Sequence, residues 1–120
     1  GSFHAGKYHR LSGCRLVAVA DIDSGKARKT AKKYGVAFSG DFEDILADVD
    51  AVTVATPAST HYDIALKCLR QGVHVLVEKP VCETPEQAKA LIAASETAGV
   101  RFQVGHVERF NPAILRADKL

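Results

Sequence analysis

Short apolar runs alternate with longer amphipathic stretches along this chain. Runs rich in Val, Leu and Ala predict buried strands over residues 16–20, 51–55, 73–77 and 100–104, and residues 36–38 predict a short extra strand. Helical periodicity fills the intervals, over residues 24–34, 41–47, 60–71 and 84–98. Strands separated by helices of this length need right-handed crossovers, so the pattern predicts a doubly wound α/β fold with a parallel sheet.

The last helical stretch carries the clearest end signals. Thr84 is suited to the N-cap, Pro85 to the first helical position, and Gln87 completes a capping box. Gly99 is placed to end the helix. These signals predict a well-defined helix between two buried strands.

The composition is that of an ordinary globular domain, or of part of one. Of the 120 residues 47% are hydrophobic, enough for a core, and the net charge of +2 does not argue for nucleic acid or a membrane surface. The densest basic patch, residues 26–33, falls on an outward helix face, and no apolar run approaches membrane-spanning length. Three cysteines (Cys14, Cys68 and Cys82), without CxxC spacing or a secretory leader, predict a reducing cytoplasm, and Cys68 shares an apolar helix face.

Polar and turn-forming residues follow every one of the four main strand runs. Asp21 follows the first run, Thr56-Pro57 the second, Glu78-Lys79-Pro80 the third and Gly105-His106 the fourth. The carboxyl ends of parallel strands meet at one edge of a sheet, and open α/β sheets bind ligands there. The sequence therefore predicts a binding site, suited to a dinucleotide, at this edge.

Asp21 is a candidate ligand for the adenosine ribose. An acid at the end of such a strand accepts hydrogen bonds from both ribose hydroxyls, each worth about 1.5–3 kcal/mol. The same charge repels a 2′-phosphate, and the neighbouring Ile22 is uncharged, so the pair predicts NAD rather than NADP. The alternative is that Asp21 caps the helix beginning near Ser24, a task that Asp23 or Ser24 can also perform.

Lys79 is a candidate for chemistry because it lies directly beyond an apolar strand. The alternative is a surface turn with a solvated lysine. The turn at residues 56–60 leads into a helix whose first N–H groups can bind anionic or polar atoms, and His61 is equally suited to a structural or a ligand-contacting role. His106 and Glu108 lack the spacing of a helical zinc pair, so no metal site is predicted.

The chain opens on Gly1-Ser2-Phe3-His4-Ala5-Gly6, which predicts the start of a helix that should follow a strand. Gly1 is either the third glycine of a GxGxxG phosphate loop or the first residue of a Gly-Ser tag remnant. The residues taken alone leave both interpretations open.

Several of these motifs resemble the Gfo/Idh/MocA family of NAD(P)-dependent oxidoreductases. The resemblance is carried by residues 75–80 (Val-Leu-Val-Glu-Lys-Pro), by Thr84-Pro85, and by Ala55-Thr56-Pro57 with His61. Phe3-His4-Ala5 is similar to that family's first helix, which favours Gly1 as the last loop glycine, and residues 17–21 are similar to its second strand. Residues 105–112 resemble the segment that crosses into the family's second domain. Their sequence is similar to that of members acting as nucleotide-sugar 3-dehydrogenases.

The resemblance implies a Rossmann-type NAD-binding domain over residues 1–111, incomplete at its N-terminus because the first strand and most of the glycine loop are missing. Residues 112–120 would begin the crossing into a substrate domain that is not part of the chain, and through which the protein would form a homo-oligomer. The implied reaction moves a hydride between NAD and the hydroxyl carbon of a sugar or nucleotide sugar, and the chain alone would be inactive. The rival interpretation is a dinucleotide-binding sensor without turnover, which needs no amine at the position of Lys79.

The resemblance also implies roles for individual residues. Lys79 would bind the reacting hydroxyl and stabilise its alkoxide, assisted by a histidine of the other domain, while Glu78 would position the nicotinamide ribose. Arg109 would line the nicotinamide end of the cleft. The full cofactor-binding set is Gly1, Asp21, Ile22, Ala55, Thr56, Pro57, His61, Glu78, Lys79 and Arg109.

Overall fold

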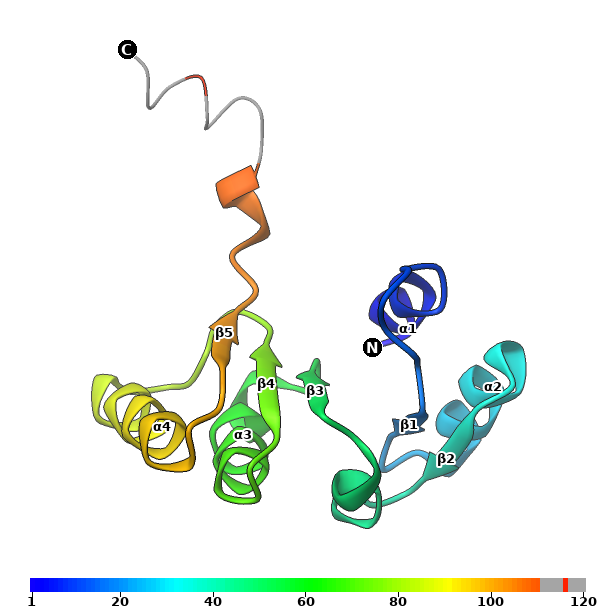
Figure 1. Cartoon of the computed structure of the whole chain (residues 1–120), viewed down its shortest axis with the longest axis horizontal. Helices are drawn as coiled ribbons and strands as arrows, with labels where there is room; N and C mark the ends of the chain where they lie inside the picture. The colour runs from blue at the N-terminus through cyan, green and yellow to red at the C-terminus, as the bar shows by residue number, and fades with distance from the viewer. Residues whose placement is uncertain (111–115, 117–120) are drawn as a thin grey trace.

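Parallel strands form two sheets in the computed structural model, which describes residues 1–110 and residue 116. One sheet pairs β1 (Ala18–Ala20) with β2 (Ala37–Ser39), and the other has the order β3 (Ala51–Val54), β4 (His74–Val77), β5 (Phe102–Val104) (Figure 1). Every pairing is parallel, which confirms the predicted α/β class. The crossing predicted for residues 112–120 lies outside the described residues, apart from residue 116.

Helices connect the strands as the periodicity predicts. The α-helices are α1 (Ser2–Tyr8), α2 (Ser24–Tyr34), α3 (His61–Arg70) and α4 (Pro85–Ala98), and the 3₁₀ helices are η1 (Phe42–Asp48), η2 (Ala58–Thr60) and η3 (Val107–Phe110). The capping box of α4 is present, with Thr84 accepting from Gln87 N–H and Gly99 ending the helix at φ 67°. The stretch predicted at 41–47 is a 3₁₀ helix whose N-cap is Asp41.

The core lies where α3 and α4 pack against the three-stranded sheet. Leu69, Leu91 and Cys68 are fully buried there beside Val75 and Val77. Burial raises the pKa of the Cys68 thiol to about 11, because the apolar surroundings disfavour the thiolate. The prediction that Cys68 serves packing is confirmed.

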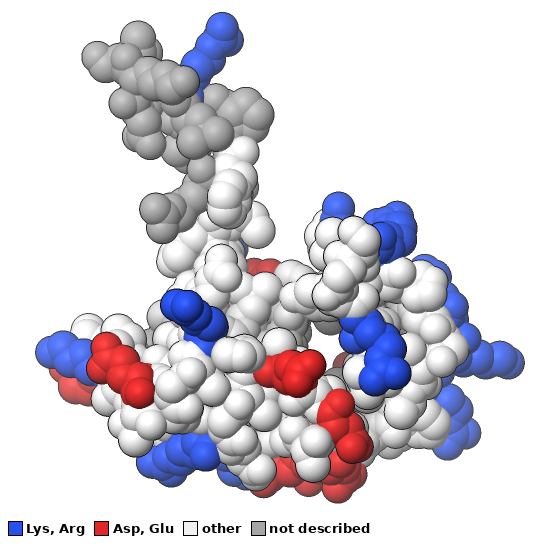
Figure 2. All heavy atoms as spheres, in the orientation of Figure 1, with Lys and Arg blue, Asp and Glu red and all other residues white. Residues whose placement is uncertain are grey.

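The basic patch of α2 faces outward. Its inward residues Ala27 and Ala31 are buried, whereas the lysines and Arg28 between residues 26 and 33 are exposed. Figure 2 shows these blue side chains gathered over the half of the molecule that holds α2. Arg28 lies over the ring of Phe38 with its guanidinium carbon 5.3 Å from the centroid, so part of the patch covers apolar surface of β2.

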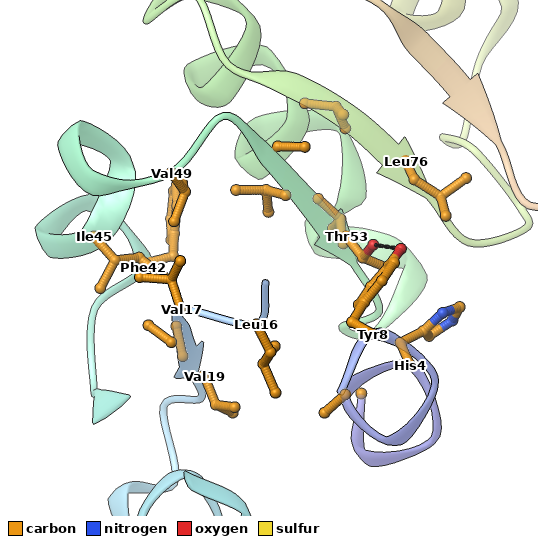
Figure 3. A pocket seen from close by; sticks show the side chains of 18 of the residues that line it. His4, Tyr8, Leu16, Val17, Val19, Phe42, Ile45, Val49, Thr53 and Leu76 are labelled. Atoms are coloured by element: carbon orange, nitrogen blue, oxygen red, sulfur yellow. Dashed lines mark hydrogen bonds between the residues drawn. The ribbon is translucent and has the colours of Figure 1, made fainter. Parts of the chain in front are cut away.

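A slot the length of a strand separates the two sheets. A cavity of about 990 Å³ lies between them and is lined by Val17 and Val19 of one sheet (labelled in Figure 3). Val52 and Val54 of the other sheet line it as well. β1 and β3 are not hydrogen-bonded to each other, so each turns an unpaired edge towards this space. Apolar side chains from both sheets therefore line this slot, which reaches the carboxyl edge.

Candidate functional site

Backbone hydrogen bonds place the predicted site residues directly at the carboxyl edge. Asp21 N–H donates to Ser39 O (3.2 Å), Glu78 N–H to Val54 O (2.9 Å) and Gly105 N–H to Val77 O (2.7 Å). Each strand end is therefore fixed by its neighbour. The sequence argument that these residues meet at one edge is confirmed within each sheet, and Gly1, Asp21, Ile22 and Thr56 all line the cavity at this end.

Asp21 does not cap α2, because Asp23 does. Asp23 accepts the N–H groups of Gly25 and Lys26, and the backbone hydrogen bond from Lys26 lowers the pKa of this exposed carboxyl. Asp21 Oδ1 accepts the N–H of Asp23 at 2.9 Å, and its other oxygen accepts no hydrogen bond from the described residues. The half-buried Asp21 carboxylate is thus oriented by the backbone and keeps one oxygen for a ligand.

Ile22 lies next to this carboxylate and is 96% exposed. An aliphatic side chain so exposed beside a cavity gives a bare apolar surface at this end of the edge. The nearest cationic side chain on the helix that follows, Lys26, is paired with Asp23 at 3.4 Å. This pairing points Lys26 towards the cap and weakens the case that it serves a 2′-phosphate.

The turn after β3 is braced by side-chain hydroxyls. Thr60 Oγ1 lies 2.8 Å from both Thr56 Oγ1 and Pro57 O, so its hydroxyl closes the turn into η2. Thr56 and Pro57 are exposed at the edge and Ala55 is half-buried behind them. These three residues of the cofactor-binding set implied by the resemblance therefore lie at the carboxyl end of β3.

His61 lies beneath this turn. Its side chain is 2% exposed, with Nδ1 2.7 Å from Pro80 O and Nε2 2.8 Å from Thr56 O. Each ring nitrogen therefore lies within hydrogen-bond distance of a main-chain carbonyl oxygen, and a neutral imidazole donates to one of the two. The structural role left open by the sequence is the one that the geometry favours: His61 joins the turn after β3 to the turn after β4.

Glu78 is held on two sides. Its Oε1 accepts a hydrogen bond from His4 Nε2 at 2.7 Å, and the imidazole is the donor because a carboxylate only accepts. On another side it packs on the backbone of the buried Gly105, where an added Cβ would come within 3.1 Å of Oε2. His4 could not be recognised from the sequence as a site residue, because its partner lies 74 residues away and no local pattern links the two.

Lys79 is exposed at the tip of the turn after β4, and its peptide bond to Pro80 is cis. Among the described residues no carboxylate pairs with its ammonium group. Lys79 is therefore an exposed lysine without an ion-pair partner among these residues. The backbone of Arg109 lies in η3, but its side chain lies outside the described part of the structure.

The described residues hold no group of three or more His, Cys, Asp or Glu side chains arranged to bind a metal ion. Among the helices of this described part, none has the length and apolar character needed to cross a membrane.

The fold and this edge define a dinucleotide-binding domain of the Rossmann type. Residues 1–106 match the model of the oxidoreductase family with an NAD-binding Rossmann fold. The chain belongs to this family, the Gfo/Idh/MocA oxidoreductases, and the resemblance noted from the sequence is confirmed.

Named relatives are dehydrogenases. The chain is 37% identical over 114 residues to UDP-N-acetylglucosamine 3-dehydrogenase of Acidithiobacillus ferrooxidans, covering 95% of this chain and 36% of the relative. It is 37% identical over 112 residues to scyllo-inositol 2-dehydrogenase (NAD(+)) of Bacillus subtilis, covering 91% of this chain and 33% of the relative. The solved structure of GenD2 from gentamicin A biosynthesis, in complex with NAD, superposes with a TM-score of 0.94 at 32% identity. The superposition covers 98% of this chain and 34% of the GenD2 chain. The chain thus spans about a third of each of these proteins.

Proposed function

We propose that this chain is the cofactor-binding part of an NAD-dependent dehydrogenase that acts on a hydroxyl group of a sugar or nucleotide sugar. The observation that carries the proposal is the position of Asp21 and of Glu78-Lys79 at the carboxyl ends of their strands, where backbone hydrogen bonds hold Asp21 to β2 and Glu78 to β3. The relatives that bind NAD or oxidise sugar hydroxyls support the same assignment.

The residues of this edge fit NAD. The free oxygen of Asp21 is suited to the ribose hydroxyls of the adenosine half, and a 2′-phosphate at about 4 Å would meet repulsion of about 4 kcal/mol per pair of charges in an intermediate dielectric. Ile22 supplies apolar surface beside it. At the other end of the edge, Glu78 presents a fixed carboxylate to the second ribose.

Lys79 carries the chemistry of the proposed reaction. NAD, when bound, supplies the hydride acceptor. The Lys79 ammonium would donate a hydrogen bond to the substrate hydroxyl oxygen and stabilise the alkoxide that forms when the hydroxyl proton passes to the assisting histidine of the other domain, while the hydride on the same carbon goes to NAD. An exposed lysine without a carboxylate partner among the described residues is free to take this position.

The slot between the sheets supports the proposal that the domain, residues 1–111 here, includes one more strand. A parallel strand would pair with the open edges of β1 and β3 and bury the valines that line the slot. Gly1 lines the same cavity as Asp21, so such a strand would run to the carboxyl edge and turn there into α1. We place the substrate domain and the contacts of a homo-oligomer beyond residue 112, and the free cysteines support a cytoplasmic location.

A titration tests the proposal. The full-length protein is titrated with NAD and with NADP by calorimetry, and NADH formation is then followed with a panel of free sugars, inositols and nucleotide sugars. We expect NAD to bind at least about tenfold more tightly than NADP, a difference of about 1.4 kcal/mol, and one class of the panel to be oxidised. Tighter binding of NADP would show that Asp21 does not face the ribose, and the absence of binding by either cofactor would refute the function.

A further inference from the structure

The Glu78 carboxylate is the point at which three separate elements meet. It follows β4 directly, it packs on Gly105 at the end of β5, and it accepts a hydrogen bond from His4 of α1. Side-chain exposures of 22% for His4 and 28% for Glu78 show that the pair is largely shielded from water. A charge-assisted hydrogen bond in such a place is stronger than one on an open surface.

The His4 ring is itself held in place from the other side. It stacks on the ring of Tyr8 with centroids 6.4 Å apart and planes 25° apart (Figure 3 shows both side chains on the wall of the cavity). The Tyr8 hydroxyl in turn lies 2.6 Å from Thr53 Oγ1 on β3. The orientation of His4 is therefore fixed by a chain of contacts that begins in the sheet.

The contacts leave a specific part of Glu78 free. Oε1 is used by His4, and the carbon and both oxygens of the carboxylate lie 3.1–3.3 Å from the position a Cβ on Gly105 would take. A carboxylate has lone pairs for about four hydrogen bonds, so one that is held this way can still accept from a ligand hydroxyl. What His4 and Gly105 restrict is the rotation of the group.

We propose that His4 is a positioning residue for Glu78, and that this hydrogen bond fixes the carboxylate at the angle needed to bind the nicotinamide ribose. The inference rests on the proposed function, because it assigns the ribose to Glu78. It adds that α1 supports the nicotinamide half of the site, while Asp21 serves the adenosine half on the other sheet.

Ligands of increasing length separate this role from a structural one. The full-length protein and its His4→Ala variant are titrated with ADP, ADP-ribose and NAD; ADP lacks the second ribose, and ADP-ribose has it without nicotinamide. We expect His4→Ala to lower the affinity for ADP-ribose and for NAD by about tenfold or more, and to change the affinity for ADP by less than about twofold. His4→Gln, whose amide can still donate to the carboxylate, is expected to restore most of the lost affinity.

Two further variants control the result. His9→Ala removes an exposed histidine of the same helix region and should leave all three affinities unchanged. In a Glu78→Gln background, His4→Ala should have little additional effect, because the two residues act as one unit. If His4→Ala loses as much affinity for ADP as for NAD, or loses no affinity for ADP-ribose, the role of His4 is overturned. If the unmodified protein binds none of the three ligands, the proposed function is overturned, and the inference with it.

Discussion

Replacing His61 with alanine tests how the site is held together. His61→Ala removes a ring that is 2% exposed and leaves the carbonyl oxygens of Thr56 and Pro80 without the nitrogens that lie 2.8 and 2.7 Å from them. A neutral imidazole donates to one of these carbonyls, and losing that partner in a buried place costs about 1–3 kcal/mol. The cavity left by the ring adds roughly 2 kcal/mol. The sum is about 3–5 kcal/mol, a large part of the ~5–15 kcal/mol that stabilises a typical domain.

Urea unfolding of the full-length protein, followed by far-ultraviolet circular dichroism, measures this loss. His61→Asn keeps one hydrogen-bond donor, so its free energy of unfolding is expected to lie between those of the unmodified protein and His61→Ala. His106→Ala removes an exposed histidine and should change the free energy of unfolding by less than about 0.5 kcal/mol. A loss below about 1 kcal/mol for His61→Ala would refute the reasoning, because it would mean that the ring does not hold the two turns.

Three other results are expected. Gly105→Ala should weaken NAD binding by about tenfold in calorimetric titration, because the new Cβ would come within 3.1 Å of the Glu78 carboxylate and push it from its place; unchanged affinity would mean that Glu78 can move freely. In the native protein a thiol reagent should label the exposed Cys14 and spare Cys68, whose pKa is raised to about 11 by burial; equal labelling would contradict the core assignment. The isolated 120-residue chain should melt broadly and bind NAD poorly, because the open edges of β1 and β3 leave backbone groups unpaired; a sharp melt with micromolar NAD binding would show that the slot needs no further strand.

The parts of the fold that depend on local patterns were predictable from the sequence. The capping box at Thr84 and Gln87 acts within a single helix turn, so its residues could be recognised without knowing the fold. The alternation of apolar strands and helices predicted parallel pairing, which in turn placed Asp21 and Glu78 at the carboxyl edge. Strand lengths were less predictable: β1 is shorter than its apolar run, since only one of its edges has a partner.

The contacts that organise the site were not predictable, because they join distant segments. His4 and Glu78 are 74 residues apart, and only the packing of α1 against the sheet brings them together. The sequence left His61 open between a structural and a ligand-contacting role, because its place after a turn says nothing of the direction of its ring; the fold buries that ring against Pro80. The sequence did not decide whether Asp21, Asp23 or Ser24 is the N-cap of α2. In the structure, the backbone geometry selects Asp23.

The measurement that tests the central claim most directly separates turnover from cofactor affinity in a Lys79→Ala variant of the full-length protein. With the sugar or nucleotide sugar that the full-length protein oxidises as substrate, we expect turnover to fall by roughly 10²–10⁴-fold while the Kd for NAD changes by less than about threefold. Lys79→Arg should keep NAD binding without restoring turnover, since the planar guanidinium keeps the charge but cannot take the position of the compact ammonium at the reacting oxygen. Turnover that survives in Lys79→Ala, or that falls only in step with NAD affinity, would contradict the claim that this edge carries out hydride transfer with Lys79 at the reacting hydroxyl.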